Sequence, residues 1–141
     1  MRRFLVTGGA GFIGSNLCNR IVENGHEAVV IDNLSVGDSN VAELEKIGVK
    51  LEVKDIVDYD DIKGVFEGVD YVIHFAAMNR AQRSIEDPLG SNKVNIEGTI
   101  NCLEASRQAG VKRFVNISSS SVYASQRDVL LEESMPLAPP H

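Results

Sequence analysis

The sequence predicts an α/β fold, with a parallel β-sheet and helices on both of its faces. Short apolar runs of strand length alternate with segments of helical periodicity from the first residues onward. Most of these runs are continuous, which is typical of strands buried on both faces. Strict alternation with short connections favours right-handed β-α-β crossovers, and these produce a parallel sheet.

The first strand–helix–strand unit covers residues 4–31. Residues 4–6 are an apolar run that ends at glycines, and residues 28–31 are a second such run. Between them, residues 13–23 predict a helix that ends at Asn24-Gly25. Its predicted apolar face consists of Ile13, Leu17, Ile21 and Val22.

The next units repeat this pattern. A polar loop at 33–40 leads to a short helix at 41–47 and to a third strand at 49–53, whose polarity alternates. Residues 58–66 predict a helix with an acidic first turn, which the helix dipole favours. Residues 71–75 predict the fourth strand.

A long helix from about residue 92 to 109 and a fifth strand at 114–117 complete the pattern. Beyond Tyr123 we expect an extended loop, because prolines recur and no periodicity is present. The apolar face of the long helix is predicted from Ile96, Ile100 and Leu103, with Cys102 and Ala105 beside them.

Composition excludes several classes of protein. The chain has 141 residues, 14 basic and 20 acidic side chains, a formal net charge of −6 and 43% hydrophobic residues, so it is not a disordered acidic chain. The acidic balance without a basic stripe argues against nucleic-acid binding. No apolar run is long enough to span a membrane. Cys18 and Cys102 lack the spacing of a metal site and fit buried thiols in the cytoplasm, so we expect no metal.

Three spaced glycines occupy the connection between the first strand and the first helix. Gly8 allows a tight turn, Gly11 lets the backbone approach a pyrophosphate, and Gly14 lets the helix pack close to the strand. The N-terminus of the following helix offers free N–H groups to negative charge. This arrangement predicts a dinucleotide-binding site.

Asp32 ends the second strand, 18 residues after Gly14. A carboxylate at this place accepts hydrogen bonds from an adenosine ribose and repels a 2′-phosphate. The next residue is Asn33 rather than an arginine, so the sequence predicts NAD rather than NADP. The alternative is a solvated acid at a strand end.

Further candidates follow the other strands, because ligands of open parallel sheets bind outside the carboxyl ends of the strands. Asp55 and Ile56 follow the third strand and are placed to meet an adenine ring. Asn95 lies early in the long helix, where a surface position explains it equally well. The remaining candidates at this edge are Phe75, Ala76 and Ala77 and the serines Ser118, Ser119 and Ser120.

Six motifs in order resemble the extended short-chain dehydrogenases/reductases, and within them the NAD-dependent nucleotide-sugar epimerases and dehydratases. They are Thr7-Gly-Gly-Ala-Gly-Phe-Ile-Gly14, Asp32-Asn-Leu-Ser35, Asp55-Ile56, His74-Phe-Ala-Ala77, Asn95-Ile-Glu-Gly-Thr99 and Ser118-Ser-Ser-Ser-Val-Tyr123. The resemblance implies an incomplete NAD-binding Rossmann-like domain at 1–141 with strand order 3-2-1-4-5. The C-terminal strands and the substrate domain of the family are expected to be absent.

The resemblance also assigns roles to residues. Gly8, Gly11 and Gly14 would hold the pyrophosphate with Phe12 and Ile13, Asp32 and Asn33 would hold the ribose, and Asp55 and Ile56 would flank the adenine. Phe75, Ala76, Ala77, Asn95 and Ser118 would line the cofactor channel. Ser119, or its neighbour Ser120, would be the catalytic serine, and Asn79, Arg83 and Ser84 would border the sugar.

The implied activity is 4-epimerisation of a nucleotide-sugar, a UDP-sugar in the nearest type, by transient oxidation with NAD. The family's catalytic Tyr and Lys form a YxxxK helix expected beyond this chain, so we expect the chain alone to be inactive. Tyr59 and Lys63 spell YxxxK, but they lie in the helix after the third strand, and we interpret them as a surface coincidence.

Several alternatives stay open at this point. Dehydratase relatives usually carry Thr-Asp-Glu where this chain has Ser119-Ser120-Ser121, which favours an epimerase. A stand-alone, non-catalytic NAD-binding module is the second possibility, and a fragment that binds nothing stably is a third. The resemblance further implies a cytoplasmic homodimer that assembles through helices.

Overall fold

Five parallel strands form a single sheet in the order β3-β2-β1-β4-β5. The computed structural model describes residues 1–79, 81–123 and 130–139. Fold class and strand order are therefore confirmed. The strands are β1 (Arg3–Thr7), β2 (Glu27–Asp32), β3 (Lys50–Val53), β4 (Tyr71–His74) and β5 (Arg113–Asn116).

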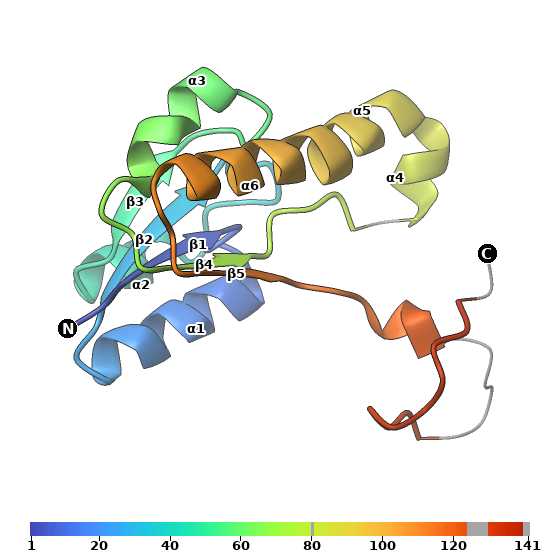
Figure 1. Ribbon diagram of the computed structural model, residues 1–141, viewed down its shortest axis with the longest axis horizontal. Coiled ribbons are helices and arrows are strands. Elements are labelled where there is room, and N and C mark those ends of the chain that lie inside the picture. Colours follow the sequence, from blue (N-terminus) through green and yellow to red (C-terminus); the bar gives the residue numbers. More distant parts are fainter. Residues whose placement is uncertain (80, 124–129, 140–141) are drawn as a thin grey trace.

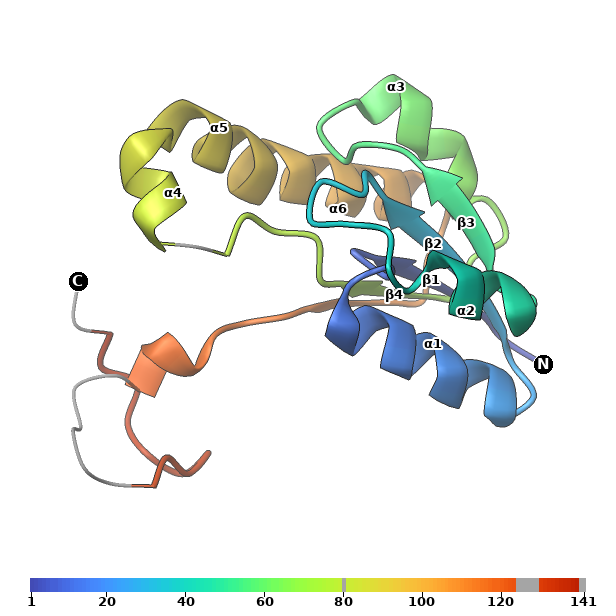
Figure 2. The ribbon, with the colours of Figure 1, turned by 180° about the vertical axis from the view of Figure 1, so that it is seen from behind.

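Helices cover both faces of the sheet (Figure 1). On one face lie α1 (Phe12–Glu23) and α2 (Val41–Lys46), and on the other lie α3 (Tyr59–Ile62), the 3₁₀ turn η1 (Lys63–Phe66) and α6 (Thr99–Gln108). The view from behind shows the same two layers (Figure 2). Each layer has its own core. In the first core, Leu5, Val29 and Val72 of the sheet are buried together with Phe66 of η1 and Cys102 of α6. In the second, Val6 and Val30 of the sheet are buried together with Cys18 of α1 and Leu44 of α2.

Small residues make up most of the buried positions in the main helices. In α1 the buried positions are Gly14, Ser15, Cys18 and Ile21, whereas the predicted Ile13 is 63% exposed. In α6 they are Cys102, Ala105 and Ser106, whereas the predicted Ile96, Ile100 and Leu103 are 45–57% exposed. The prediction is therefore confirmed for Ile21, and for Cys102 and Ala105 beside the stripe of the long helix, and Leu17 and Val22 pack partly buried against the core. It is wrong for the exposed Ile13, Ile96, Ile100 and Leu103. Small side chains let α6 approach the sheet closely, which leaves the aliphatic stripe of the long helix outside.

The long helix begins four residues earlier than predicted. In Figure 1, α5 (Pro88–Asn92) and α6 belong to one continuous helix, joined by the π-helical segment η2 (Lys93–Gly98). Asp87 caps it, because its Oδ1 accepts the Gly90 N–H at 2.9 Å, and Pro88 takes the first helical position. A short helix, α4 (Ala81–Glu86), precedes it.

The predicted helix at 58–66 divides into α3 and η1. Asp58 caps α3 by accepting the Asp61 N–H at 3.2 Å. Lys50–Val53 and Phe12–Glu23 each differ by one residue at the start from the expected strand and helix.

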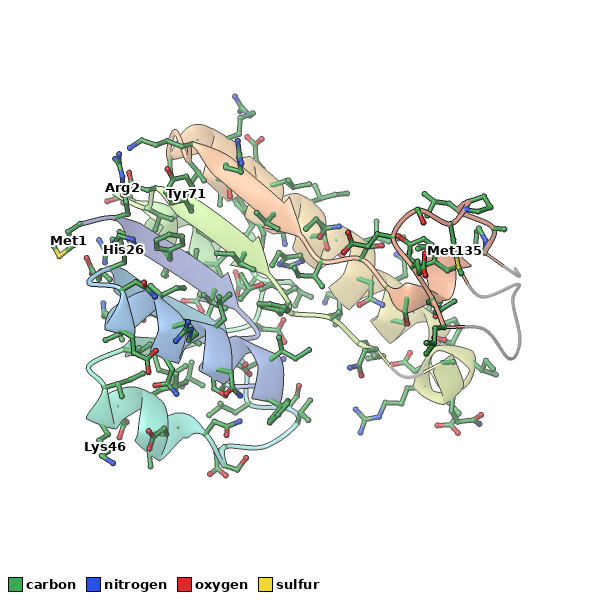
Figure 3. The ribbon with its side chains drawn as sticks, turned by 90° about the horizontal axis from the view of Figure 1, so that it is seen from below. Met1, Arg2, His26, Lys46, Tyr71 and Met135 are labelled. Atoms are coloured by element: carbon green, nitrogen blue, oxygen red, sulfur yellow. The ribbon has the colours of Figure 1, made fainter. Side chains whose placement is uncertain are left out.

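One half of the sheet has a bare face. From below, β4 and β5 are seen without a helix of the described residues in front of them (Figure 3). An open groove there is lined by Phe4, Tyr71, Ile73, Lys112, Arg113 and Val115.

The described C-terminal residues carry little regular structure. After β5 comes the single turn η3 (Ser120–Tyr123), and residues 130–139 contain no helix or strand, as expected for an extended loop. The other parts of the predicted loop, residues 124–129 and 140–141, lie outside the described residues. Of the helices that the structure describes, none is both long and apolar enough to cross a membrane.

Candidate dinucleotide-binding site

The turn after β1 brings backbone into contact with the end of β4. Gly8 has φ +69°, a conformation that side-chain-bearing residues rarely adopt, and its N–H donates to the Ile31 carbonyl at 2.8 Å. A Cβ at Gly8 would lie 2.8 Å from the backbone N of Ala76. Only glycine therefore fits at this position.

Two more glycines let the turn, the helix and β2 lie close together. A Cβ at Gly9 would lie 2.5 Å from Cγ2 of Val30 on β2. A Cβ at Gly14 would lie 2.6 Å from the Gly8 carbonyl oxygen. Gly14 thus lets α1 pack on the turn itself, and Gly9, which the sequence reasoning did not single out, supplies the approach to the strand. At Gly11 the nearest atom to a Cβ is the Gly8 oxygen at 3.2 Å.

The N-terminus of α1 presents unpaired donors beside this turn. The first N–H to bond within the helix is that of Ser15, which donates to the Gly11 carbonyl at 2.9 Å. The N–H groups of Phe12, Ile13 and Gly14 precede it and have no partner among the described residues. With the positive end of the helix dipole, they form a site for an anion such as a pyrophosphate.

Asp32 is joined to the glycine turn. Its Oδ2 accepts the Ala10 N–H at 3.0 Å, and its Oδ1 accepts the Leu34 N–H at 2.9 Å. Asn40 holds the other side of Ala10, because its Nδ2 donates to the Ala10 carbonyl at 2.8 Å. An ionised carboxylate has about four acceptor sites, so each oxygen of Asp32 keeps capacity for a ligand hydroxyl. Asp32 is thus more than a solvated acid at a strand end.

The ends of β2 and β3 are bridged in the same way. Asn33 Nδ2 donates to Asp55 Oδ2 at 2.8 Å. The side chain of Ile56 is 4% exposed and packs against Gly98 in η2, so it belongs to the core. The Ile56 N–H has no partner among the described residues. An apolar contact between this side chain and an adenine is therefore disfavoured. The Ile56 N–H and the Asp55 carboxylate, from adjacent residues, instead offer a ligand one donor and one acceptor.

A buried polar chain connects β1, β4 and the long helix. Thr7 Oγ1 lies 2.6 Å from His74 Nδ1, and His74 Nε2 lies 3.0 Å from Thr99 Oγ1. Thr99 Oγ1 donates to the Asn95 carbonyl at 2.8 Å, and the Ala76 N–H donates to Thr7 Oγ1 at 3.3 Å. Burial lowers the pKa of His74 to about 4.

Asn95 is bonded to the loop after β4 rather than free on the helix surface. Its Oδ1 accepts the Met78 N–H at 2.7 Å, and its Nδ2 donates to the Met78 carbonyl at 3.0 Å. The loop that begins with Phe75, Ala76 and Ala77 is thereby fixed at both ends, by the glycine turn and by the long helix.

The predicted sugar-side residues are placed separately. Ser118, Ser119 and Ser120 are exposed after β5, where Ser119 Oγ accepts the Ser121 N–H at 3.1 Å. Asn79 is exposed before α4, Arg83 is exposed in it, and Ser84 Oγ donates to the Ala81 carbonyl at 2.7 Å. Among the described residues no hydrogen bond joins these two groups.

The literal YxxxK pair lies outside this site. The Tyr59 hydroxyl is buried without a hydrogen-bond partner among the described residues, so its side chain is not the surface group we expected. Lys63 Nζ, in η1, pairs with the exposed Asp60 of α3 at 2.6 Å.

Parallel sheet, glycine turn and strand-end acid together define the class of dinucleotide-binding α/β proteins. The chain belongs to the NAD dependent epimerase/dehydratase family, whose sequence model matches residues 4–141. Membership of this family confirms NAD as the predicted cofactor.

Named relatives and solved structures support this assignment. UDP-glucose 4-epimerases from Streptomyces lividans and Mus musculus are 39% and 38% identical, over 97% and 96% of this chain. The UDP-glucose-4-epimerase of Stenotrophomonas maltophila, solved with NAD and formylated UDP-arabinopyranose, superposes with a TM-score of 0.85 at 34% identity and 98% coverage of this chain. The dTDP-glucose 4,6-dehydratase of Streptomyces venezuelae, solved with NAD, gives 0.81 at 34% identity and 97% coverage.

The matches reach less than half of each relative. The chain spans 42% and 43% of the two curated epimerases and 43% and 45% of the two solved chains.

Proposed function

We propose that residues 1–141 form the NAD-binding portion of a nucleotide-sugar 4-epimerase that acts on a UDP-sugar. The observation that carries this proposal is the bonded unit formed by the glycine turn and Asp32. The Asp32 carboxylate accepts a hydrogen bond from the Ala10 N–H in the turn. A diphosphate bound at the turn and a ribose bound at Asp32 would therefore have a fixed spacing. The 4-epimerase names of similar proteins supply the reaction class.

The chain's own atoms fit a dinucleotide across the carboxyl edge of the sheet. The N–H groups of Phe12, Ile13 and Gly14 would bind the pyrophosphate, because nothing else among the described residues pairs with them. Asp32 and Asn33 would hold the adenosine ribose. The N–H of Ile56 and the carboxylate of Asp55 match the acceptor and donor on the edge of adenine.

When bound, NAD would supply reversible hydride transfer, which would oxidise the sugar carbon and then reduce the keto-sugar from its other face. This chain would contribute the serine side of the site. The hydroxyl of Ser119, with Ser120 as the alternative, would share the proton of the reacting sugar hydroxyl and orient its oxygen. Asn79, Arg83 and Ser84 would border the sugar, and Ser118 would line the channel.

The serine triplet supports the epimerase over the dehydratase. Elimination of water from the sugar calls for a neighbouring acid, and residues 119–121 are all serine. The exposed aliphatic stripe of Ile96, Ile100 and Leu103 on the long helix supports assembly as a homodimer.

Calorimetric titration tests the cofactor site. We expect the folded chain to bind NAD, and to bind NADP about 100-fold more weakly, because the carboxylate repels a 2′-phosphate. Asp32→Asn, which removes the charge and keeps the size, should narrow this difference to about tenfold. Folded protein that does not bind NAD, or that prefers NADP, contradicts the proposal.

A turnover assay tests the catalytic assignment. Purified 141-residue protein incubated with NAD and UDP-glucose should produce no UDP-galactose, because none of Tyr59, Tyr71 and Tyr123 matches the base of the family's YxxxK motif. As a control, a polypeptide that carries a YxxxK helix is added to the same assay. Formation of UDP-galactose in that mixture would show that the NAD-binding portion is competent. Turnover by the chain alone would overturn the assignment of the catalytic Tyr and Lys to a helix beyond these residues.

A further inference from the structure

The hydrogen bonds of the buried polar chain have a defined direction. The Asn95 carbonyl only accepts, so the Thr99 hydroxyl gives its single proton to it. Thr99 Oγ1 must then accept from His74 Nε2. His74 is neutral, since burial lowers its pKa to about 4, so its Nδ1 accepts the proton of Thr7 Oγ1. The Thr7 oxygen accepts the Ala76 N–H.

This direction satisfies each donor and acceptor once. Thr7 is fully buried and His74 is 4% exposed, so a missing partner could not be replaced by bulk water. The chain of bonds therefore sets the position of the Asn95 carbonyl relative to β1 and β4.

Asn95 passes this constraint to the loop after β4. It lies in the π-helical segment η2, a form of helix that recurs at functional sites. While its carbonyl is fixed by Thr99, its side-chain amide bonds both the N–H and the carbonyl of Met78. The loop at 75–78 is thus fixed through the helix.

The strand order decides which part of a dinucleotide meets this loop. β2 and β4 flank β1 on opposite sides. With the pyrophosphate at the glycine turn and the adenosine at Asp32, the other half of the dinucleotide extends over the end of β4.

We propose that His74 is a positioning residue for the nicotinamide half of the cofactor, and that it acts through Thr99 and Asn95 on the loop at 75–78. The proposal rests on the NAD site proposed above.

A matched pair of variants at Thr99 tests it. Thr99→Val keeps the shape and removes the hydroxyl, which leaves the His74 Nε2–H without an acceptor. Thr99→Ser keeps the hydroxyl. We expect Thr99→Val to bind NAD about tenfold more weakly, because the loop at 75–78 would have to be ordered when NAD binds, and to bind ADP within about twofold of the original affinity. Thr99→Ser should bind both ligands as the unaltered chain does.

Amide hydrogen exchange of the ligand-free proteins supplies a second readout. Exchange at residues 75–78 should accelerate in Thr99→Val and not in Thr99→Ser, while α1 and β2 keep their protection. NAD affinity unchanged in Thr99→Val, or an equal loss for NAD and ADP, would overturn the positioning role. Failure of the unaltered chain to bind NAD would instead refute the NAD site itself, and this proposal with it.

Discussion

Gly8→Ala is expected to abolish NAD binding and to lower the free energy of unfolding by about 3 kcal/mol. The new Cβ would lie 2.8 Å from the Ala76 backbone N, and alanine would have to adopt φ +69°. Neither conflict can be relieved by a side-chain rotation, because the opposing atoms are backbone. Urea unfolding and calorimetry with NAD measure the two effects.

Gly64→Ala is the matched control for this change. A Cβ at Gly64 meets nothing within 4 Å, and its φ is not positive. We expect its free energy of unfolding to change by less than about 0.5 kcal/mol, with NAD binding intact. If Gly8→Ala behaved like this control, the close contact between the turn and β4 would be refuted.

The stability of the chain should fall by as much as about 3 kcal/mol between pH 6.5 and pH 4 through His74 alone. Burial lowers the pKa of His74 from 6.5 to about 4. In this interval the unfolded chain binds a proton that the folded chain does not, so the stabilisation is complete above pH 6.5 and is lost as the pH falls. Urea unfolding at a series of pH values measures the slope.

His74→Asn removes this titrating group and leaves the others in place. Its unfolding free energy should therefore depend less on pH between 6.5 and 4 than that of the unaltered chain. The NMR signal of the His74 ring gives a direct check that does not depend on a variant. A titration midpoint near 6.5 in the folded protein would contradict the proposed neutral, buried imidazole.

Local patterns in the sequence predict the sheet and the turn well. Continuous apolar runs mark the strands because a parallel sheet buries both faces. Gly8 and Asp32 are recognisable because their neighbours in sequence, the first strand and the second, fix their context. For these residues the physical cause lies within about thirty residues of chain.

Helix faces and the polar chain are harder to predict from the sequence. A hydrophobic pattern selects the aliphatic Ile96, Ile100 and Leu103, yet the helix buries Cys102 and Ala105, because close approach of helix and sheet favours small volumes. Thr99 meets His74 from 25 residues away, and Asn40 meets Ala10 from 30. No local signal distinguishes these polar residues from surface ones.

Asp32 imposes a constraint on redesign of this scaffold. Exchanging the acid for an apolar or cationic residue, so as to admit a phosphorylated ribose, also removes the acceptor for the Ala10 N–H, whereas asparagine would keep one acceptor oxygen. Cofactor swapping with such a residue therefore calls for a paired substitution. Asn40 holds the same residue from its carbonyl side, so Ala10 would keep only one of its two side-chain anchors.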